Sequence, residues 1–187
     1  FGVSSKLYPF YGEYKSSGAV KDGLFVSEEY KQLWDTKKKK RQTVVFFENK
    51  KVVYFNSDPP PSSKPFLDFF NLDSAVDPIA AALELLINDS NKKVYTVFDG
   101  RRVYALEAKE IIDNKKMRYN NFVGLKKYKL LITNYKNVWK NHNKTNLKKI
   151  IVIVGGESLK EVFPLSFVIY NKGLVFKIDY TSHSYLD

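Results

Sequence analysis

From Val94 to Tyr180 the chain repeats one pattern: short runs of β-branched and aromatic residues alternate with turn-forming residues. Runs of this kind predict β-strands. Because most of the connections are too short to hold a helix, neighbouring strands should pair antiparallel rather than build parallel βαβ units. The predicted strands are Val94–Phe98, Arg102–Ile112, Phe122–Tyr135, Lys148–Val154, Pro164–Tyr170 and Leu174–Tyr180.

The N-terminal part, Leu7–Asp58, also reads as extended segments. The runs "TVVFFE" and "KVVYFN" flank a turn at Glu48–Lys51, which predicts a hairpin. The following segment, "SDPPPSSKP" at Ser57–Pro65, contains four prolines. Proline lacks the N–H that a sheet ladder needs, so this segment should be a loop that leaves the sheet.

One helix is predicted, and it comes next along the chain after this loop. Asp77 can cap its start and Pro78 suits its first turn. Asn88–Asn91 should end it. Its apolar residues follow helical spacing: Ile79, Ala82, Leu83, Leu86 and Ile87. The fold expected is mainly β, a large curved antiparallel sheet with one short helix and a proline-rich loop inserted midway.

The length of 187 residues suits a single domain over residues 1–187. The 44% of hydrophobic residues is ample for a core. There is no cysteine, which excludes disulfides, thiolate zinc sites and a cysteine nucleophile. No apolar run approaches the roughly 20 residues of a membrane span. The sequence begins with Phe1 instead of methionine, so we expect a trimmed or mature form.

The formal net charge is +11, and lysine supplies almost all of the excess. This charge would suit a nucleic acid, an anionic membrane surface or an acidic ligand, but it is also typical of a solvated surface without a partner. The run "KKKKR" at Lys37–Arg41 fits a charged hairpin tip or an edge strand. Nucleic acid is disfavoured, because the aromatic residues are needed in the core. Peripheral contact with a membrane stays open.

The stretch "FDGRR" is the strongest hairpin signal in the chain, with Asp99–Gly100 as the turn. If Arg101 and Arg102 both lie on a strand, they point to opposite faces and cannot easily grip one ligand together, so a joint clamp is disfavoured. Arg102 should share a face with Tyr104 and with Leu106, and it needs a partner such as Asp99 or Glu107. We expect a structural role for this pair, with Arg102 as the anion-binding candidate.

No constellation of catalytic or metal-binding residues is apparent. The run "IVIVGGE" at Ile151–Glu157 lacks the lysine and serine of a phosphate loop, so a strand and a turn are expected. His142 and His183 have no second ligand at metal-binding spacing. The acidic residues give no convergent pair for acid–base work. We therefore expect a protein that is not an enzyme, with no catalytic residues, no metal and no cofactor.

Several motifs occur in one order along the chain: "YGEYKSSGAVKDGLFVSEEY", "KKRQTVVFFENKKVVYFNSDPP", "DPIAAALELL", "VFDGRRVYALE" and "PLSFVIYNKGLVFKIDY". In these motifs the chain resembles, from about Tyr11 to Tyr180, an exported-protein family of Gram-negative bacteria known as domain of unknown function number three-one-zero-eight. The resemblance implies a periplasmic or envelope location. It also implies a fold similar to the lipoprotein carriers, a half-barrel-like sheet that holds acyl chains against a helix. It supplies no catalytic residues.

A curved sheet with one amphipathic helix on it would form an apolar groove, and a lipid or lipoprotein-like ligand would bind there. The same residues could instead be ordinary core. The candidate groove residues are Phe66, Phe69, Phe70, Leu72, Ile79, Leu83, Leu86, Tyr104 and Leu106. The alternative is an interaction module that docks an envelope protein through a sheet edge or a basic face, with Lys37–Arg41 and the polar, exposed loop Lys136–Leu147 as candidates.

Overall fold

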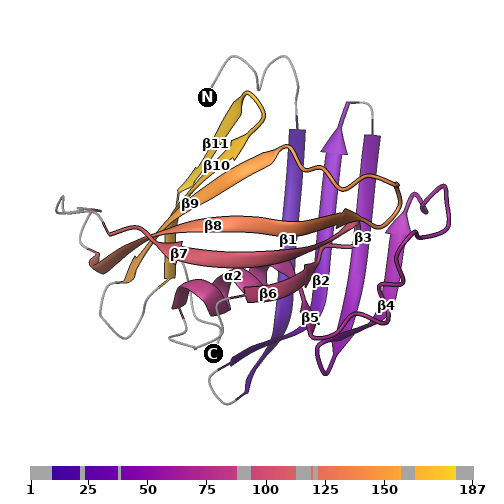
Figure 1. Ribbon diagram of the computed structural model, residues 1–187, viewed down its shortest axis with the longest axis horizontal. Coiled ribbons are helices and arrows are strands. Elements are labelled where there is room, and N and C mark those ends of the chain that lie inside the picture. Colours follow the sequence, from indigo (N-terminus) through magenta and orange to yellow (C-terminus); the bar gives the residue numbers. More distant parts are fainter. Residues whose placement is uncertain are drawn as a thin grey trace.

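The computed structural model describes residues 10–21, 24–37, 39–87, 94–112, 119, 122–156 and 163–179. Its strands form two sheets (Figure 1). The first sheet has four antiparallel strands in sequence order: β1 (Phe10–Lys21), β2 (Leu24–Thr36), β3 (Lys39–Glu48) and β4 (Lys51–Asp58).

The second sheet has seven strands in the order β11-β10-β9-β8-β7-β6-β5. All its pairs are antiparallel except β5 with β6, which is parallel. The helix α2 (Pro78–Ile87) follows β5. The strands are β5 (Ala75–Val76), β6 (Val94–Phe98), β7 (Arg102–Glu110), β8 (Val123–Asn137), β9 (Leu147–Gly156), β10 (Phe163–Asn171) and β11 (Leu174–Asp179).

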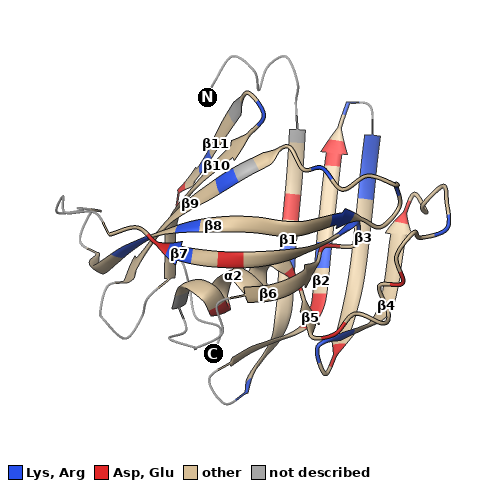
Figure 2. Ribbon diagram, in the orientation of Figure 1, with Lys and Arg blue, Asp and Glu red and all other residues tan. Residues whose placement is uncertain are grey.

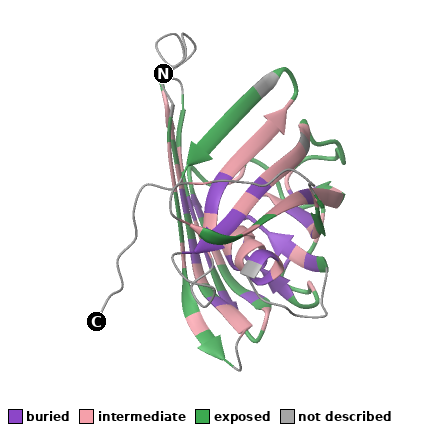
Figure 3. Ribbon diagram, turned by 90° about the vertical axis from the view of Figure 1, so that its left-hand side faces the viewer, coloured by how far each residue is buried: buried purple, intermediate pink, exposed green. Residues whose placement is uncertain are grey.

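The two sheets face each other, and α2 lies between them. Their strands run in different directions, so the sheets cross in the view of Figure 1. Seen from the side, buried residues gather on the facing surfaces and around the helix, whereas the outer surfaces are largely exposed (Figure 3). The helix contacts β1 and β2 on one side and β6, β7 and β10 on the other.

The prediction of a mainly antiparallel β fold with one short helix after a proline-rich loop is confirmed. One difference is that the strands form two sheets where a single one was expected. The prolines after β4 give the physical reason, because they end its ladder and the chain starts a new sheet at β5. The predicted end of the helix, Asn88–Asn91, lies outside the described residues.

Asp77 caps the helix, as predicted, and also ties it to the first sheet. Its Oδ1 accepts hydrogen bonds from the backbone N–H of Ile79 at 2.8 Å and of Ala80 at 3.0 Å. Its Oδ2 accepts from the hydroxyls of Ser16, at 2.9 Å, and Ser27. One buried carboxylate therefore sets the start of α2 against β1 and β2.

A cluster of aromatic rings joins the two sheets beside the Asp99–Gly100 turn. Phe98 is fully buried, and its ring stacks on Phe69 at 4.8 Å between centroids. Phe55 of β4 contacts both rings, and Trp139 contacts Phe55 at 5.3 Å. Gly100 packs against β3 with a positive φ of 82°, and a Cβ there would lie 2.5 Å from the Thr43 Cγ2. The turn is thus held tightly against the first sheet.

Candidate ligand-binding groove

A cavity of about 870 Å³ lies between α2 and the inner face of the seven-stranded sheet. Pro78, Ile79, Ala82 and Leu83 form its helical side. The strands β7 to β10 form the opposite wall with apolar side chains: Leu106, Leu130, Ile132, Ile150, Pro164, Phe167 and Ile169. Small-molecule sites in proteins span about 300–1,000 Å³, so this cavity is large enough for a ligand.

The register of the strands explains why this wall is apolar. Leu130 pairs with Ile150, Ile150 with Ile169, and Ile169 with Phe176. Directly paired residues of antiparallel strands point to the same face, so one apolar row crosses four strands. The row ends on the edge strand β11, where Phe176 is 47% exposed and Ile178, which pairs with the cavity-lining Phe167, is 56% exposed. The apolar wall therefore continues beyond the cavity onto β11.

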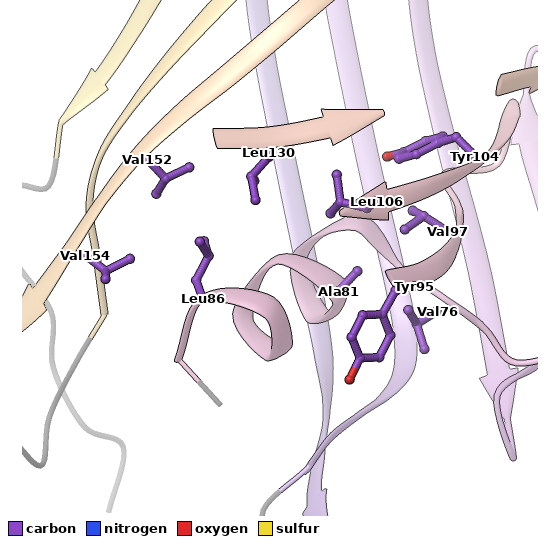
Figure 4. Packing of buried hydrophobic residues seen from close by; sticks show 10 residues of the cluster. All are labelled: Val76, Ala81, Leu86, Tyr95, Val97, Tyr104, Leu106, Leu130, Val152 and Val154. Carbon is purple, nitrogen blue, oxygen red and sulfur yellow. The ribbon is translucent and has the colours of Figure 1, made fainter. Parts of the chain in front are cut away.

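The second half of the helix packs against the sheet as part of the core. Leu86 points toward Val152 and Val154 of β9, within a core cluster that also holds Ala81, Leu106 and Leu130 (Figure 4). The space between helix and sheet is thus partly filled core and partly cavity, and the first turns of α2 face the cavity.

The end of the cavity near the Asp99–Gly100 turn is polar and mostly cationic. It is lined by Asp99, Arg101, Arg102, Asn137, Lys140, His142, Lys144, Thr145 and Asn146. A β-bulge in β8 contributes to this lining: Asn134 has a positive φ of 51°, and the register against β7 shifts there. Bulges re-aim the side chains that follow. Tyr135 and Asn137 consequently line the cavity, and Tyr135 stacks with His142 at 6.5 Å between ring centroids.

The turn that carries the two arginines is fixed from several sides. The Asp99 Oδ1 accepts hydrogen bonds from the backbone N–H of Arg101 at 2.9 Å and of Arg102 at 2.7 Å. The Asp99 Oδ2 accepts from the Nη1 of Arg102 at 3.2 Å. Trp139 donates its indole N–H to the Gly100 carbonyl at 3.0 Å, and Val138 donates its backbone N–H to the Arg101 carbonyl at 2.9 Å. The backbone that carries the Arg101 and Arg102 side chains is therefore fixed by hydrogen bonds.

A smaller cavity of about 160 Å³ adjoins this cationic end, and we call it the arginine chamber. Trp34, Arg101 and Arg102 line both cavities. The other lining residues lie on β2, which contributes Gln32 and Thr36, and at the start of β3, which contributes Lys39 and Arg41. Figure 2 shows the start of β3 in blue. Trp34 pairs with Arg41 and Thr36 with Lys39, so these four side chains share one face of the sheet.

The positive charges of the arginine chamber are poorly compensated. Arg41 and Arg101 each have a buried Nε–H that has no hydrogen-bond partner within the described part of the chain. Burial, together with the nearby charges of Arg41 and Arg102, lowers the pKa of Arg101 below its ordinary value. Arginine nevertheless stays protonated in proteins, so the chamber keeps its cations.

Four of the nine predicted groove residues line the large cavity: Ile79, Leu83, Tyr104 and Leu106. Arg102, the anion-binding candidate, also lines it. Five others do not line it, which corrects the prediction. Phe69 is buried in the aromatic cluster and Leu72 packs against that cluster. Leu86 is buried in the core under the helix. Phe66 is 65% exposed and Phe70 is also exposed.

The expectation that strand alternation places Arg101 and Arg102 on opposite faces is wrong. Both side chains line both cavities. Strand alternation does not separate them, because β7 begins at Arg102 and Arg101 still belongs to the turn. The pairing of Arg102 with Asp99 is confirmed.

The expectation that Lys136–Leu147 is an exposed loop is confirmed for residues 140–146 but is wrong for the start of the segment. β8 extends to Asn137, Val138 is fully buried, and Trp139 joins the aromatic cluster. The large cavity is bordered by three residues that follow Trp139: Lys140, His142 and Lys144. The single tryptophan in an otherwise polar segment is the signal that could have indicated this burial.

Sequence reasoning missed Trp34, Arg41 and Tyr135 as residues of the site. Lys37–Arg41 was expected at a hairpin tip or an edge strand, and its described residues, Lys37 and Lys39–Arg41, do lie at the β2–β3 hairpin tip, whereas Lys38 lies outside the described residues. Strand alternation could have indicated that Lys39 and Arg41 share one face and that Lys40 lies on the other. The bulge that turns Tyr135 inward had no comparable signal.

Metal-binding groups and membrane-spanning helices were also sought among the residues that the structure describes. No group of three or more His, Asp or Glu residues in these ranges could hold a metal ion. His183 lies outside them. No described helix is long and apolar enough to cross a membrane. The run at Ile151–Gly156 is part of β9, and Gly155 is packed against Leu125 and Leu165.

No protein-family model, no curated protein and no solved structure matches this chain. The resemblance to the exported family of unknown function thus stays a prediction, and the case for function depends on the two cavities.

Proposed function

We propose that the protein binds an amphipathic ligand with one aliphatic chain in the cavity between α2 and the seven-stranded sheet. The observation that supports this proposal is the polarity of the cavity. Its walls along β7 to β10 are apolar, whereas its end at the Asp99–Gly100 turn carries Arg101 and Arg102. An aliphatic chain would be removed from water by the walls, and a polar head would meet the arginines.

The apolar surface beside the cavity also fits a chain-like ligand. The apolar row continues from Ile169 to the exposed Phe176 on β11. Exposed apolar surface that is continuous with a cavity is typical of a ligand-binding groove. A chain longer than the cavity could therefore extend over β11 without losing apolar contact.

A variant that fills the cavity tests this proposal. Leu83 lines the cavity from α2, and it is only partly buried, so Leu83→Trp should occupy the ligand space without disrupting the core. We expect this variant to bind parinaric acid about tenfold or more weakly in a fluorescence titration.

Phe66→Ala is the matched control. Phe66 comes from the aromatic segment ahead of the helix, but it is exposed and lies away from the cavity lining. The Phe66→Ala variant should bind parinaric acid with the same affinity as the unmodified protein. Thermal unfolding of both variants checks that they fold. Equal affinity of folded Leu83→Trp, or no binding by the unmodified protein, would overturn the proposal.

The proposed role is binding and not catalysis, in the periplasm or the cell envelope. The location depends on the sequence resemblance. A second candidate function, docking of an envelope protein, is favoured by one observation: the edge strand β11 exposes Val175, Phe176 and Ile178. An exposed apolar edge can accept a strand from a partner. The titration discriminates between the two, because a pure docking module would not bind parinaric acid.

A further inference from the structure

We infer that the arginine chamber, built by Lys39, Arg41, Arg101 and Arg102, is a head-group site for a phosphate-type dianion. This inference deepens the proposed function and rests on it, because it states which class of amphiphile the groove takes. The chemical class is an alkyl phosphate or a lipid with a terminal phosphate monoester.

The first argument is the convergence of cations from two separate parts of the chain. Lys39 and Arg41 come from the β2–β3 hairpin, and Arg101 and Arg102 come from the turn before β7. The aromatic cluster and the contact of Gly100 with Thr43 hold the two parts together. The cations therefore converge on a fixed site, unlike lysines spread over a solvated surface.

The second argument is the balance of charge. Among the described residues, the lining of the chamber contains four cationic side chains and no carboxylate. Asp99 lines the neighbouring cavity, and its carboxylate already accepts bonds from two backbone N–H groups and from Arg102. A carboxylate ligand carries one negative charge, whereas a phosphate monoester carries about 1.5 to 2 near neutral pH. The dianion matches the excess charge better.

The third argument is the unused hydrogen-bonding capacity of the arginines. The Nε–H groups of Arg41 and Arg101 are buried without a hydrogen-bond partner in the described ranges, which is unfavourable. Phosphate oxygens suit guanidinium donors because they can accept bidentate, charge-assisted hydrogen bonds. A phosphate has enough oxygens to accept from more than one arginine at a time.

The fourth argument is that the two cavities adjoin at a shared set of lining residues. Trp34, Arg101 and Arg102 line both of them. The chamber holds about 160 Å³, which is several times the roughly 30 Å³ of one liquid water and suits a small oxyanion. The aliphatic chain of the same ligand would then lie in the larger cavity along α2.

Calorimetric titration with four ligands tests the inference. Three of them, dodecyl phosphate, dodecanoate and dodecanol, share one chain and differ in head group, and the fourth is inorganic phosphate. We expect dodecyl phosphate to bind about tenfold more tightly than dodecanoate, and more tightly still than dodecanol. It should also bind at least about tenfold more tightly than inorganic phosphate, because the chain contributes apolar burial.

Substitutions in the arginine chamber test whether its side chains bind the head group. Arg41→Gln should weaken dodecyl phosphate binding about tenfold and leave dodecanol binding unchanged. Arg41→Lys keeps the charge but not the guanidinium fork, so it should restore only part of the affinity. The matched control is Lys40→Gln, from the same run but on the other face of β3, which should bind all four ligands as the unmodified protein does. Thermal unfolding confirms that each variant folds.

The outcomes separate this inference from the proposed function. If the three chain ligands bind equally and Arg41→Gln changes nothing, the groove binds chains and the inference is overturned. Inorganic phosphate binding as tightly as dodecyl phosphate would also overturn it, because the anion would then not be a head group. If none of the three chain ligands binds, the proposed function itself fails.

Discussion

Replacing Asp77 with alanine should lower the free energy of unfolding by about 3–5 kcal/mol. Asp77 is completely buried and accepts hydrogen bonds from two backbone N–H groups of α2 and from two serine hydroxyls of the first sheet. Loss of the helix cap costs about 0.5–2 kcal/mol, and each buried donor left without a partner costs about 1–3 kcal/mol more. Urea unfolding measures the change.

Two further variants separate the cap from general effects of charge. Asp77→Asn keeps one oxygen that can accept from Ile79 and Ala80, so it should lose about half as much stability. Asp73→Ala removes an exposed carboxylate from the same segment and should change the free energy of unfolding by less than about 0.5 kcal/mol. Equal, small losses for Asp77→Ala and Asp73→Ala would contradict the role assigned to Asp77.

Phe98→Ala is expected to destabilise the protein by a similar amount, about 3–5 kcal/mol. The Phe98 side chain is fully buried, stacks on Phe69 and contacts Phe55. Its loss would leave a cavity where the two sheets meet. Chemical unfolding, followed by circular dichroism, gives the free energy.

Phe66→Ala is again the control, because it deletes the same ring from an exposed position and should cost under about 1 kcal/mol. Trp139, whose indole lies next to Phe55 and Phe69, supplies a local probe of the cluster. Its fluorescence should change in Phe98→Ala and not in Phe66→Ala. Retention of full stability by Phe98→Ala would show that the cluster does not hold the sheets together.

The start of the helix and most of the strands could be predicted because local signals determine them, whereas the two-residue strand β5 was missed. Alternating apolar residues and the Asp99–Gly100 turn define the β6–β7 hairpin, and Asp77 with Pro78 defines the start of α2. These signals act over a few residues and need no knowledge of tertiary contacts. The same signals placed the "TVVFFE" and "KVVYFN" strands, which are β3 and β4.

The division into two sheets could not be predicted in the same way, because it depends on which strands pair after the proline-rich loop. The burial of Val138 and Trp139 is equally non-local, since it depends on rings from Phe55 and Phe69 far away in the sequence. A polar segment gives no sign of such contacts beyond its one large aromatic residue.

The candidate site shows the same division between local and non-local information. Helical spacing placed Ile79 and Leu83 in the groove, but it placed the core residue Leu86 there as well, so spacing alone does not separate the cavity lining from the core. Phe69 could not be distinguished from a groove residue, because its aromatic neighbours give no direction to its side chain. The arginine chamber brings Arg41 next to Arg101, which are sixty positions apart, so only the tertiary fold reveals it.

The measurement that tests the central claim most directly is nuclear magnetic resonance of methyl-labelled protein with dodecyl phosphate. We predict nuclear Overhauser contacts from the dodecyl chain to the methyl groups of Leu83, Ile150 and Ile169, which line the cavity. The methyl groups of the exposed Ile112 should show none. Contacts confined to exposed methyl groups, or no contacts at saturating ligand, would contradict the claim that the groove between helix and sheet binds an aliphatic chain.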